Sequence, residues 1–514
     1  MKIFDKIRRF FSDTGGNVAT IFALTLTPIA ILSGGAIDVS QAMNSRARLA
    51  EAMDAAALAV GGQINLTDAE ASRVAWDYIN ANYPEREVGS VQAINVHIDR
   101  DNGVVTVTGE SRVQTTLLGL MGMDDITVHW ESEVQQSRQA LELAMVLDNT
   151  GSMRGSKISA LRDAALLLTD VLYSNGDPDR LRISLVPFAA TVNVGRDYER
   201  VWWLDPDGES PVHAEWAGEG QDVRTCTGRG RRRVCTTETI QAINWDLFDS
   251  LRNTSWAGCV EARMLPYDIE DEPADASRPE TLFVPYFAPD EPDIGNFHND
   301  YLNDDRGTDG IVERITGLLK YDGGRPSGGD PNRACTTTPI TPLTNSRRTI
   351  ENAIRDMGAS GNTNIPNGIG WGVRVLSPQE PFTDGAEFGD RDTLKAMVIL
   401  TDGENVMSGN NGYFMSEYSA YGYAVHGRLG RRTASSGQLS DALDERTAAA
   451  CRYAREQGIR VYTITFQVNS SSTRNMMRDC ASHPSLYFDS PSSSALREAF
   501  NLIAGDLSNL RLSR

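Results

Sequence analysis

Hydrophobic and polar positions follow two different patterns, one on each side of about residue 140. The first part begins with a long uncharged stretch and continues through alternating runs such as VQAINVHI at residues 91–98 and VVTVT at residues 104–108. Strict alternation of apolar and polar residues predicts half-buried strands. We therefore expect a long N-terminal helix followed by a small α+β segment over residues 63–139.

The second part alternates between strand and helix patterns. Two continuous apolar runs, LELAMVL at residues 141–147 and LKAMVIL at residues 394–400, predict strands that are buried on both faces. Helical periodicity follows the first run over residues 156–172 and precedes the second over residues 365–376. This alternation predicts an α/β domain over residues 140–514, built on a doubly wound, Rossmann-like sheet whose ligands bind at the carboxyl ends of its strands.

The alternation lapses between about residues 196 and 341. This stretch is rich in Asp, Glu, Pro, Gly and Trp, and it holds four of the six cysteines. A structureless loop of that length inside a domain is improbable. We expect an inserted subdomain that relies on disulfides because it is too small to be held by a core of its own.

The six cysteines indicate an oxidising compartment. They include no CxxC pair and no Cys/His cluster with zinc spacing, which argues against a zinc knuckle, and their even number suits disulfides. Sequence alone does not fix the connectivity. We favour Cys226–Cys235 across a short loop, Cys451–Cys480 between neighbouring elements, and Cys259–Cys335 by elimination.

Length and charge limit the classes of function. A chain of 514 residues is too long for one compact domain, and its net charge is −20. Phosphate binding needs clustered Lys and Arg, so nucleic acid is not an expected partner. The basic run at residues 229–233 lies in acidic surroundings, and we interpret it as a solvated loop.

An uncharged stretch near the N-terminus predicts a membrane anchor. Residues Val18–Ile37 carry no charge over 20 positions, a length that spans about 30 Å as a helix and matches one hydrocarbon core. Lysines and arginines precede this stretch and Asp38 follows it. The positive-inside rule then predicts a single-pass protein with a cytoplasmic tail at residues 1–14 and its bulk in the periplasm.

Two other interpretations of this stretch remain open. It could be a cleaved signal peptide with Ala36 at the cleavage site, or a buried core helix. An unbroken Ala-rich helical pattern continues to about residue 60, and this favours a retained anchor and helix over residues 15–62.

Polar side chains follow both apolar strands. DNTGSM stands at residues 148–153 after the first strand, and TDGEN stands at residues 401–405 after the second. Between them, GNTNIPNG at residues 361–368 leads into a helix. Carboxylates and hydroxyls are hard oxygen ligands that suit Mg²⁺ or Mn²⁺. The alternative is that Asp148 and Asp402 only cap a helix or a turn.

These segments resemble the metal-ion-dependent adhesion site of von Willebrand factor A (vWA) domains. That site is written D-x-S-x-S, then Thr, then Asp, and the matching segments here are DNTGSM, GNTNIPNG and LTDGEN. Thr150 stands where Ser is usual, and it keeps the hydroxyl. The resemblance implies a metal shell of Asp148, Thr150, Ser152, Thr363 and Asp402.

A wider resemblance covers nearly the whole chain. GGNVATIFALTLTPIAILSGGAIDVS and RARLAEAMDAAALAV resemble the anchors of TadE/TadG-type Tad (Flp) pilus-assembly proteins, and SLVPFAATVNVG, WAGCVEAR and LFVPYFAPDEPD resemble TadG-type segments. The resemblance implies an inner-membrane protein that assembles or anchors a pilus without catalysis. Ile21 stands five residues after Gly16, where type IV-like pilins have Glu, so pilin-type processing is not expected.

Charge suggests how such a site would act. With only two protein carboxylates, a divalent cation keeps surplus positive charge and an open position for an Asp or Glu of a pilus or envelope protein. Alternatives are a metal-dependent surface adhesin and a metal-dependent hydrolase, although no Walker A, HExxH or GxSxG motif is present.

The aromatic stretch at residues 413–423 either forms a partner-contact rim or packs on the domain itself.

Overall fold

The computed structural model describes most of the chain. The described residues are 17–63, 66–83, 89–99, 103–135, 139–174, 177–218, 220–227, 232–294, 299–304, 310–335, 338–409, 414, 416–432 and 435–510. The expected cytoplasmic tail at residues 1–14, Gly16 and positions 229–231 of the basic run lie outside them. The chain divides into two compact units between residues 138 and 139.

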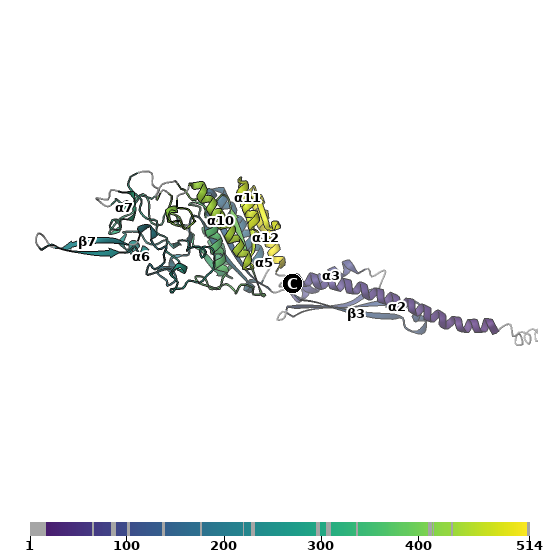
Figure 1. The fold of residues 1–514 in the computed structure, drawn as a ribbon. Coiled ribbons are helices and arrows are strands. Elements are labelled where there is room, and N and C mark those ends of the chain that lie inside the picture. Colours follow the sequence, from purple (N-terminus) through teal and green to yellow (C-terminus); the bar gives the residue numbers. More distant parts are fainter. Residues whose placement is uncertain are drawn as a thin grey trace, which may run out of the picture. The chain divides into compact units, whose positions relative to one another are not determined.

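The N-terminal unit contains one long helix, one shorter helix and a three-stranded sheet (Figure 1). Its elements are α2 (Asn17–Gly61), α3 (Asp68–Asn82), β1 (Ser90–Asp99), β2 (Val104–Gln114), the 3₁₀ helix η2 (Leu118–Met121) and β3 (Asp125–Gln135). The sheet is antiparallel in the order β1-β2-β3, and its strands contain the alternating runs that predict half-buried strands.

Small side chains let α2 lie close to this sheet. Ala52, Ala56 and other buried residues of α2 pack against Val105 and Val107 of β2. At Gly109 an added Cβ would come within 1.7 Å of the Met53 Cε atom, so a larger residue would displace the end of the Met53 side chain. Packing of small residues therefore holds the helix against the sheet.

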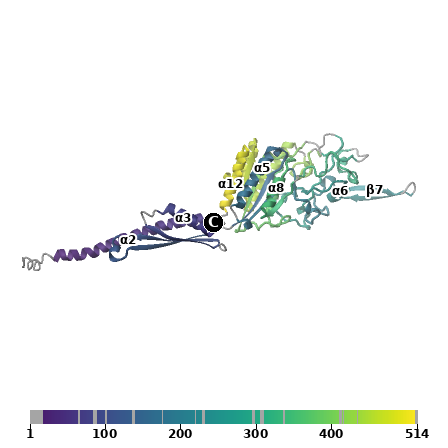
Figure 2. The ribbon, with the colours of Figure 1, turned by 180° about the vertical axis from the view of Figure 1, so that it is seen from behind.

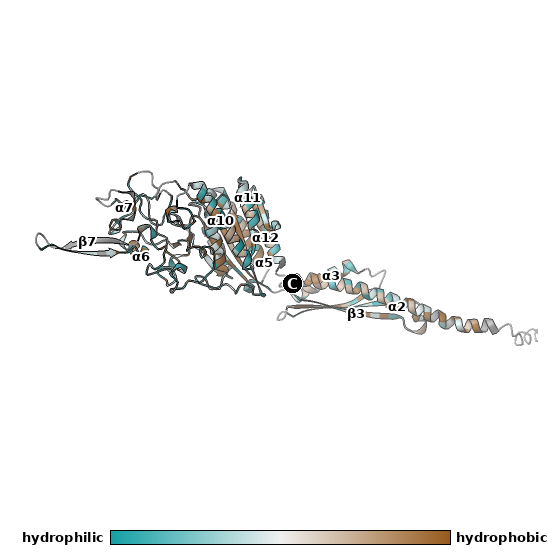
Figure 3. Cartoon of the chain, in the orientation of Figure 1, coloured by the Kyte–Doolittle hydropathy of each residue, from teal (hydrophilic) through white to brown (hydrophobic). Residues whose placement is uncertain are grey.

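The expected membrane span lies within α2. Large apolar side chains on this part of the helix are exposed, among them Phe22 at 62%, Leu24 at 72% and Leu32 at 74%. Hydrophobic turns recur along the described part of the helix (Figure 3). Within the residues that the structure describes, no helix is long and apolar enough to cross a membrane.

The C-terminal unit is a mixed α/β domain. Its main sheet has the order β13-β12-β11-β4-β5-β6-β9, and its first five strands are parallel. Those strands are β13 (Tyr487–Ser490), β12 (Arg460–Phe466), β11 (Thr393–Thr401), β4 (Ala140–Asp148) and β5 (Leu181–Phe188). The short strands β6 (Val192–Asn193), β9 (Cys259–Val260) and β10 (Thr341–Thr344) are paired antiparallel to their neighbours.

Helices cover both faces of this sheet. One face is covered by α5 (Ser156–Ser174), α8 (Arg347–Asp356) and α12 (Ser493–Leu510), which Figure 2 shows together. The other face is covered by α9 (Ile365–Leu376), α10 (Ser436–Glu456) and α11 (Ser471–Cys480). Such a doubly wound arrangement agrees with the predicted α/β class and leaves the carboxyl ends of the strands available to ligands.

The long insertion shares a core with the sheet. Buried Trp203, Trp245 and Trp256 belong to the same apolar cluster as Phe188 of β5 and Trp371 of α9. The described elements of this stretch are short: β7 (Gln221–Thr227), β8 (Val234–Ile240), α6 (Asn244–Ser250) and α7 (Ile311–Thr316). The antiparallel pair of β7 and β8 extends away from the rest of this unit (Figure 1).

Two disulfides connect segments that are distant in sequence. Cys259 bonds to Cys335 and Cys451 bonds to Cys480, which are two of the three pairings favoured from sequence. Cys235 is disulfide-bonded as well, and it lies opposite position 226 in the register of β7 and β8. No cysteine that the structure describes carries a free thiol.

The protein should therefore contain no reactive thiol before reduction. When it is denatured without reductant and treated with a maleimide, we expect no labelling, because every cysteine whose side chain the structure describes is paired and the total of six is even. Reduction before labelling is the control, and it should add six labels by intact mass. Labelling of the unreduced chain would contradict the assignment to an oxidising compartment.

Candidate metal site

Two neighbouring parallel strands bring the two aspartates of the motif together. β4 ends at Asp148 and β11 ends at Thr401, and Leu147 pairs with Leu400 in the register of the two strands. Asp402 follows β11 directly, so both carboxylates lie at the carboxyl edge of the sheet. This is the edge at which the doubly wound topology places ligands.

Asp148 is held by hydrogen bonds at the centre of the cluster. Its side chain is buried, and the Thr150 backbone N–H donates to its Oδ1 at 2.9 Å. The Thr401 hydroxyl donates to its Oδ2 at 2.8 Å. These bonds fix the carboxylate in one orientation, as a ligand group requires.

Hydroxyl groups connect the first motif segment to Asp402. Thr150 Oγ1 lies 2.8 Å from Ser152 Oγ, and the Ser152 hydroxyl donates to Asp402 Oδ1 at 2.5 Å. The structure thus brings together four of the five residues expected from sequence. Lys157, in the first turn of α5, donates from Nζ to Asp402 Oδ2 at 2.7 Å.

Backbone hydrogen bonds join the GNTNIPNG segment to the regions of the other two motif segments. The Gly151 N–H donates to the Gly361 carbonyl at 2.9 Å, and the Val406 N–H donates to the Thr363 carbonyl at 2.9 Å. Gly361 has φ +81°, a conformation that glycine adopts without strain. Thr363 is buried between segments that carry the other motif residues, at the entrance to α9.

Charge repulsion favours cation binding at this cluster. Burial and then the nearby charge of Asp402 raise the pKa of Asp148 to about 6. A bound divalent cation would relieve both effects, because it favours the charged form of each carboxylate. The set of two carboxylates and three hydroxyls therefore fits a hard cation such as Mg²⁺ or Mn²⁺. Among the described residues, no group of three or more His, Cys, Asp and Glu side chains that could hold a metal is found, and this cluster contributes only two carboxylates.

Sequence reasoning missed Thr401 and Lys157. Thr401 immediately precedes Asp402, and an inward hydroxyl at a strand end is a recognisable signal. Lys157 has no such signal, because a lysine in the first turn of a helix is usually solvated. Its role depends on the approach of α5 to a carboxylate 245 residues away.

Lys157 should compete with a metal for Asp402. Replacing it by methionine removes an ammonium group 2.7 Å from Asp402 Oδ2. We expect Mg²⁺ to bind about 10-fold more tightly to Lys157→Met, since a charged hydrogen bond contributes about 1.5–3 kcal/mol. Calorimetric titration measures this change. Lys157→Arg keeps the charge and should show no gain, and an unchanged affinity in the methionine variant would disprove the competition.

The aromatic stretch after Asp402 packs on the domain itself. Tyr418, Tyr421 and Tyr423 have exposed fractions of 6%, 1% and 0%. Their hydroxyls donate to Glu261 at 2.6 Å, Asp268 at 2.9 Å and Glu291 at 2.9 Å. A partner-contact rim is therefore wrong for these tyrosines, because buried rings with satisfied hydroxyls have no surface to offer. Tyr413 lies outside the described residues.

A cavity of about 400 Å³ lies beside the motif segments. Its lining includes Arg154, which follows the DNTGSM segment, and Ser360, Gly361 and Asn362, the last two of which begin the GNTNIPNG segment. Arg333 of the insertion lines it as well. Two arginines and two glutamates, Glu291 and Glu417, thus line a cavity that adjoins Gly361 and Asn362 of the motif.

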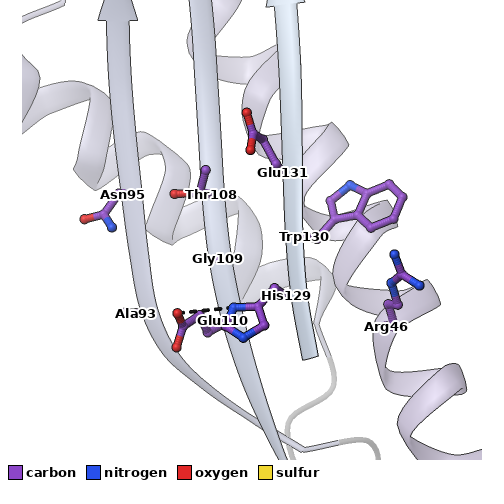
Figure 4. Close-up of a pocket in the computed structure, with 9 residues that line it drawn as sticks. All are labelled: Arg46, Ala93, Asn95, Thr108, Gly109, Glu110, His129, Trp130 and Glu131. Carbon is purple, nitrogen blue, oxygen red and sulfur yellow. Dashed lines mark ion pairs between the residues drawn. The ribbon is translucent and has the colours of Figure 1, made fainter. Parts of the chain in front are cut away.

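A second hollow lies on the solvent-facing side of the N-terminal sheet (Figure 4). His129 Nδ1 and Glu110 Oε1 are 3.2 Å apart there, with side-chain exposures of 65% and 48%. Arg46 of α2 lies over the Trp130 ring at the edge of the hollow. Exposed ion pairs of this kind contribute little, and we interpret the hollow as a solvated sheet face.

One family model matches part of the chain. Residues 16–63 match the family described as putative Flp pilus-assembly TadE/G-like, which confirms the resemblance of the N-terminal segment. No curated protein matches the chain.

Solved structures with similar folds include pilus proteins. The pilus adhesin SpaC from Lactobacillus rhamnosus GG is 11% identical with a TM-score of 0.33, covering 81% of this chain and 34% of its own. The vWF domain of the type V pili tip protein Mfa5 from Porphyromonas gingivalis is 8% identical with a TM-score of 0.33. The match covers 73% of this chain and 97% of the Mfa5 chain. Proximal thread matrix protein 1 from the mussel byssus, with a zinc-occupied MIDAS motif, is 10% identical with a TM-score of 0.28. The match covers 73% of this chain and 47% of the mussel chain.

The chain spans about a third of the length of SpaC and about half of the mussel protein. These TM-scores are too low to support an argument about this chain, so the site rests on its own geometry.

Proposed function

We propose that this protein is a membrane-anchored pilus-assembly or adhesion factor whose vWA-type domain binds a partner's carboxylate through a divalent metal. The N-terminal segment supplies the anchor, and the C-terminal unit supplies the binding site. The match of residues 16–63 to the TadE/G-like family supports the pilus assignment.

The observation that carries this proposal is the cluster at the carboxyl edge of the sheet. The Ser152 hydroxyl donates to Asp402 Oδ1 at 2.5 Å, and the Asp402 backbone N–H donates to Asp148 Oδ2 at 3.4 Å, so residues of two separate segments converge there. A metal held there by Asp148, Thr150, Ser152, Thr363 and Asp402 would keep surplus positive charge. It would supply an open coordination position that attracts an anionic group.

The cavity beside the site supports an acidic partner. Arg154 and Arg333 line it, and guanidinium groups bind carboxylates with paired hydrogen bonds. Glu417 also lines the cavity, where its carboxylate accepts bonds from Asn362 Nδ2 at 2.8 and 2.6 Å. We infer a partner segment with one carboxylate on the metal and a second acidic residue near the arginines, presented by a pilus or envelope protein.

The exposed apolar part of α2 supports the anchor. Several of its large side chains between Ile21 and Ile37 are exposed, and a bilayer would shield them from water. With basic residues before this stretch, the positive-inside rule gives an inner-membrane protein with a periplasmic bulk.

Removing both motif hydroxyls tests whether the metal is needed for assembly. We expect Thr150→Ala with Ser152→Ala to abolish surface pili as completely as deletion of the protein, because two of the expected ligands are lost. The domain should still fold, since neither change leaves an unpaired charge. Electron microscopy of the cells measures the pili, and immunoblotting of membranes measures the protein.

The matched control is Ser156→Ala with Ser174→Ala, which removes two hydroxyls from the ends of α5 outside the motif. These cells should bear normal pili. Normal pili in the Thr150/Ser152 variant would show that the metal is dispensable and that another part of the chain carries assembly. Pull-down from membranes with and without EDTA would identify metal-dependent partners in the same strains.

A further inference from the structure

The loop between β2 and β3 packs on the helix that we propose as the anchor. Residues 115–123 read TTLLGLMGM and contain no charged residue, in a chain with 23% charged residues. Within the loop, η2 contacts α2. The loop is therefore an apolar element fixed beside a second apolar element.

Two glycines of α2 make this contact possible. A Cβ at Gly34 would lie 1.8 Å from Leu117 Cδ1, and a Cβ at Gly35 would lie 3.3 Å from Leu118 Cδ2. Because Gly34 has no side chain, the Leu117 side chain can lie directly against the helix at this position. Both glycines belong to the last turn of the stretch that we propose to lie in the membrane, residues 18–37.

Asp38 fixes the loop to the helix at that level. Its carboxylate accepts the backbone N–H groups of Thr116 at 3.0 Å, Leu117 at 2.9 Å and Leu118 at 2.8 Å. The residue is 2% exposed. With its carboxylate satisfied by three donors, Asp38 can lie next to an apolar phase at a lower desolvation cost than an unpaired carboxylate.

The outer side of the loop is apolar and uncovered. Met121 and Met123 have exposed fractions of 60% and 54%, and Ile37 on the adjoining part of α2 has 57%. In the sequence, the next charged residues after the loop are Asp124 and Asp125, and Arg112 lies 3.8 Å from Asp125. Apolar side chains at the tip and charged groups one step behind it are typical of an element that enters the boundary between headgroups and acyl chains.

We propose that residues 117–123 form a second membrane contact, inserting Met121 and Met123 into the outer interface of the bilayer that holds the anchor. This inference rests on the proposed anchoring of α2. The occupant of the exposed patch is the lipid surface, because the loop is fixed to the turn of the helix at which the apolar stretch ends. The contact would set the orientation of the N-terminal unit relative to the membrane, which a single helix cannot fix.

Spin labels on the full-length chain in lipid nanodiscs test this contact. Met121→Cys and Met123→Cys each add one thiol to a chain in which no described cysteine is free. Power saturation compares the accessibility of each label to oxygen, which concentrates in lipid, and to a water-soluble nickel complex. We expect both labels to favour oxygen, as labels at the acyl boundary do.

Two further positions make the outcomes distinguishable. Gln135→Cys, at the far end of β3 and about 35 Å from the loop at about 3.3 Å per residue, should report water. Leu24→Cys should report the bilayer interior if the anchor is correct. Lipid at position 24 with water at positions 121 and 123 would overturn the loop contact and leave the anchor intact. Water at position 24 would overturn the anchor and the loop contact together.

Discussion

Replacing Asp148 by asparagine is expected to weaken the binding of Mg²⁺ or Mn²⁺ by at least about 100-fold. Mutating a residue that only hydrogen-bonds to a metal ligand lowers metal affinity by about 10- to 100-fold, and loss of a ligand should cost at least as much. Asp148 supplies one of only two carboxylates at the site, and its side chain is buried. An amide keeps the size and the oxygen that accepts the Thr150 N–H bond, but it cannot offer a negative charge. Calorimetric titration of the purified full-length protein measures the change.

The same variant should retain its folding stability without metal. The substitution removes the charge repulsion between Asp148 and Asp402, the second cause of the raised pKa of Asp148. Loss of binding with an unchanged denaturation midpoint would separate a ligand role from a structural one. Asp163→Asn, on the exposed side of α5, makes the same change of net charge and should bind metal normally. Equal affinity of the Asp148 variant and the natural protein would contradict the metal site.

Replacing Arg428 by methionine is expected to destabilise the C-terminal unit by about 3–5 kcal/mol, the usual cost of removing one partner from a buried ion pair. Arg428 donates to Glu215 Oε1 at 2.6 Å and to Glu261 Oε2 at 2.7 Å, with side-chain exposures of 3%, 16% and 0% for the three residues. Its guanidinium also donates to the carbonyls of Val212 and Ala420. It therefore connects the segment after Asp402 to the long insertion.

Urea denaturation of the oxidised, metal-free protein measures this loss as a lower midpoint. Arg355→Met is the matched control, because Arg355 pairs with Glu351 on the surface of α8 with 53% of its side chain exposed. That change should cost no more than about 1 kcal/mol. In a Glu215→Gln, Glu261→Gln background, the Arg428 substitution should cost less, since no buried carboxylate loses its partner. Equal losses for Arg428→Met and Arg355→Met would rule out a stabilising role for the buried network.

The sequence by itself determined the α/β class and the grouping of the motif segments. LELAMVL and LKAMVIL are continuous apolar runs, and such runs are stable as strands only when both faces are covered, so they predict neighbouring parallel strands. Polar residues directly after two parallel strands must meet at one edge of the sheet. The positions of Asp148 and Asp402 follow from that local pattern and the topology alone.

The tertiary structure decided which groups surround those carboxylates and which surfaces remain exposed. Thr401 bonds to Asp148 across 253 residues, and Lys157 bonds to Asp402 across 245. The tyrosines of residues 418–423 were compatible with either a rim or a packed loop until Glu261, Asp268 and Glu291 supplied acceptors for their hydroxyls. Periodicity reports only the environment that a residue's own helix or strand requires. Partners that arrive from distant segments depend on how those elements pack, and no local pattern in the sequence records them.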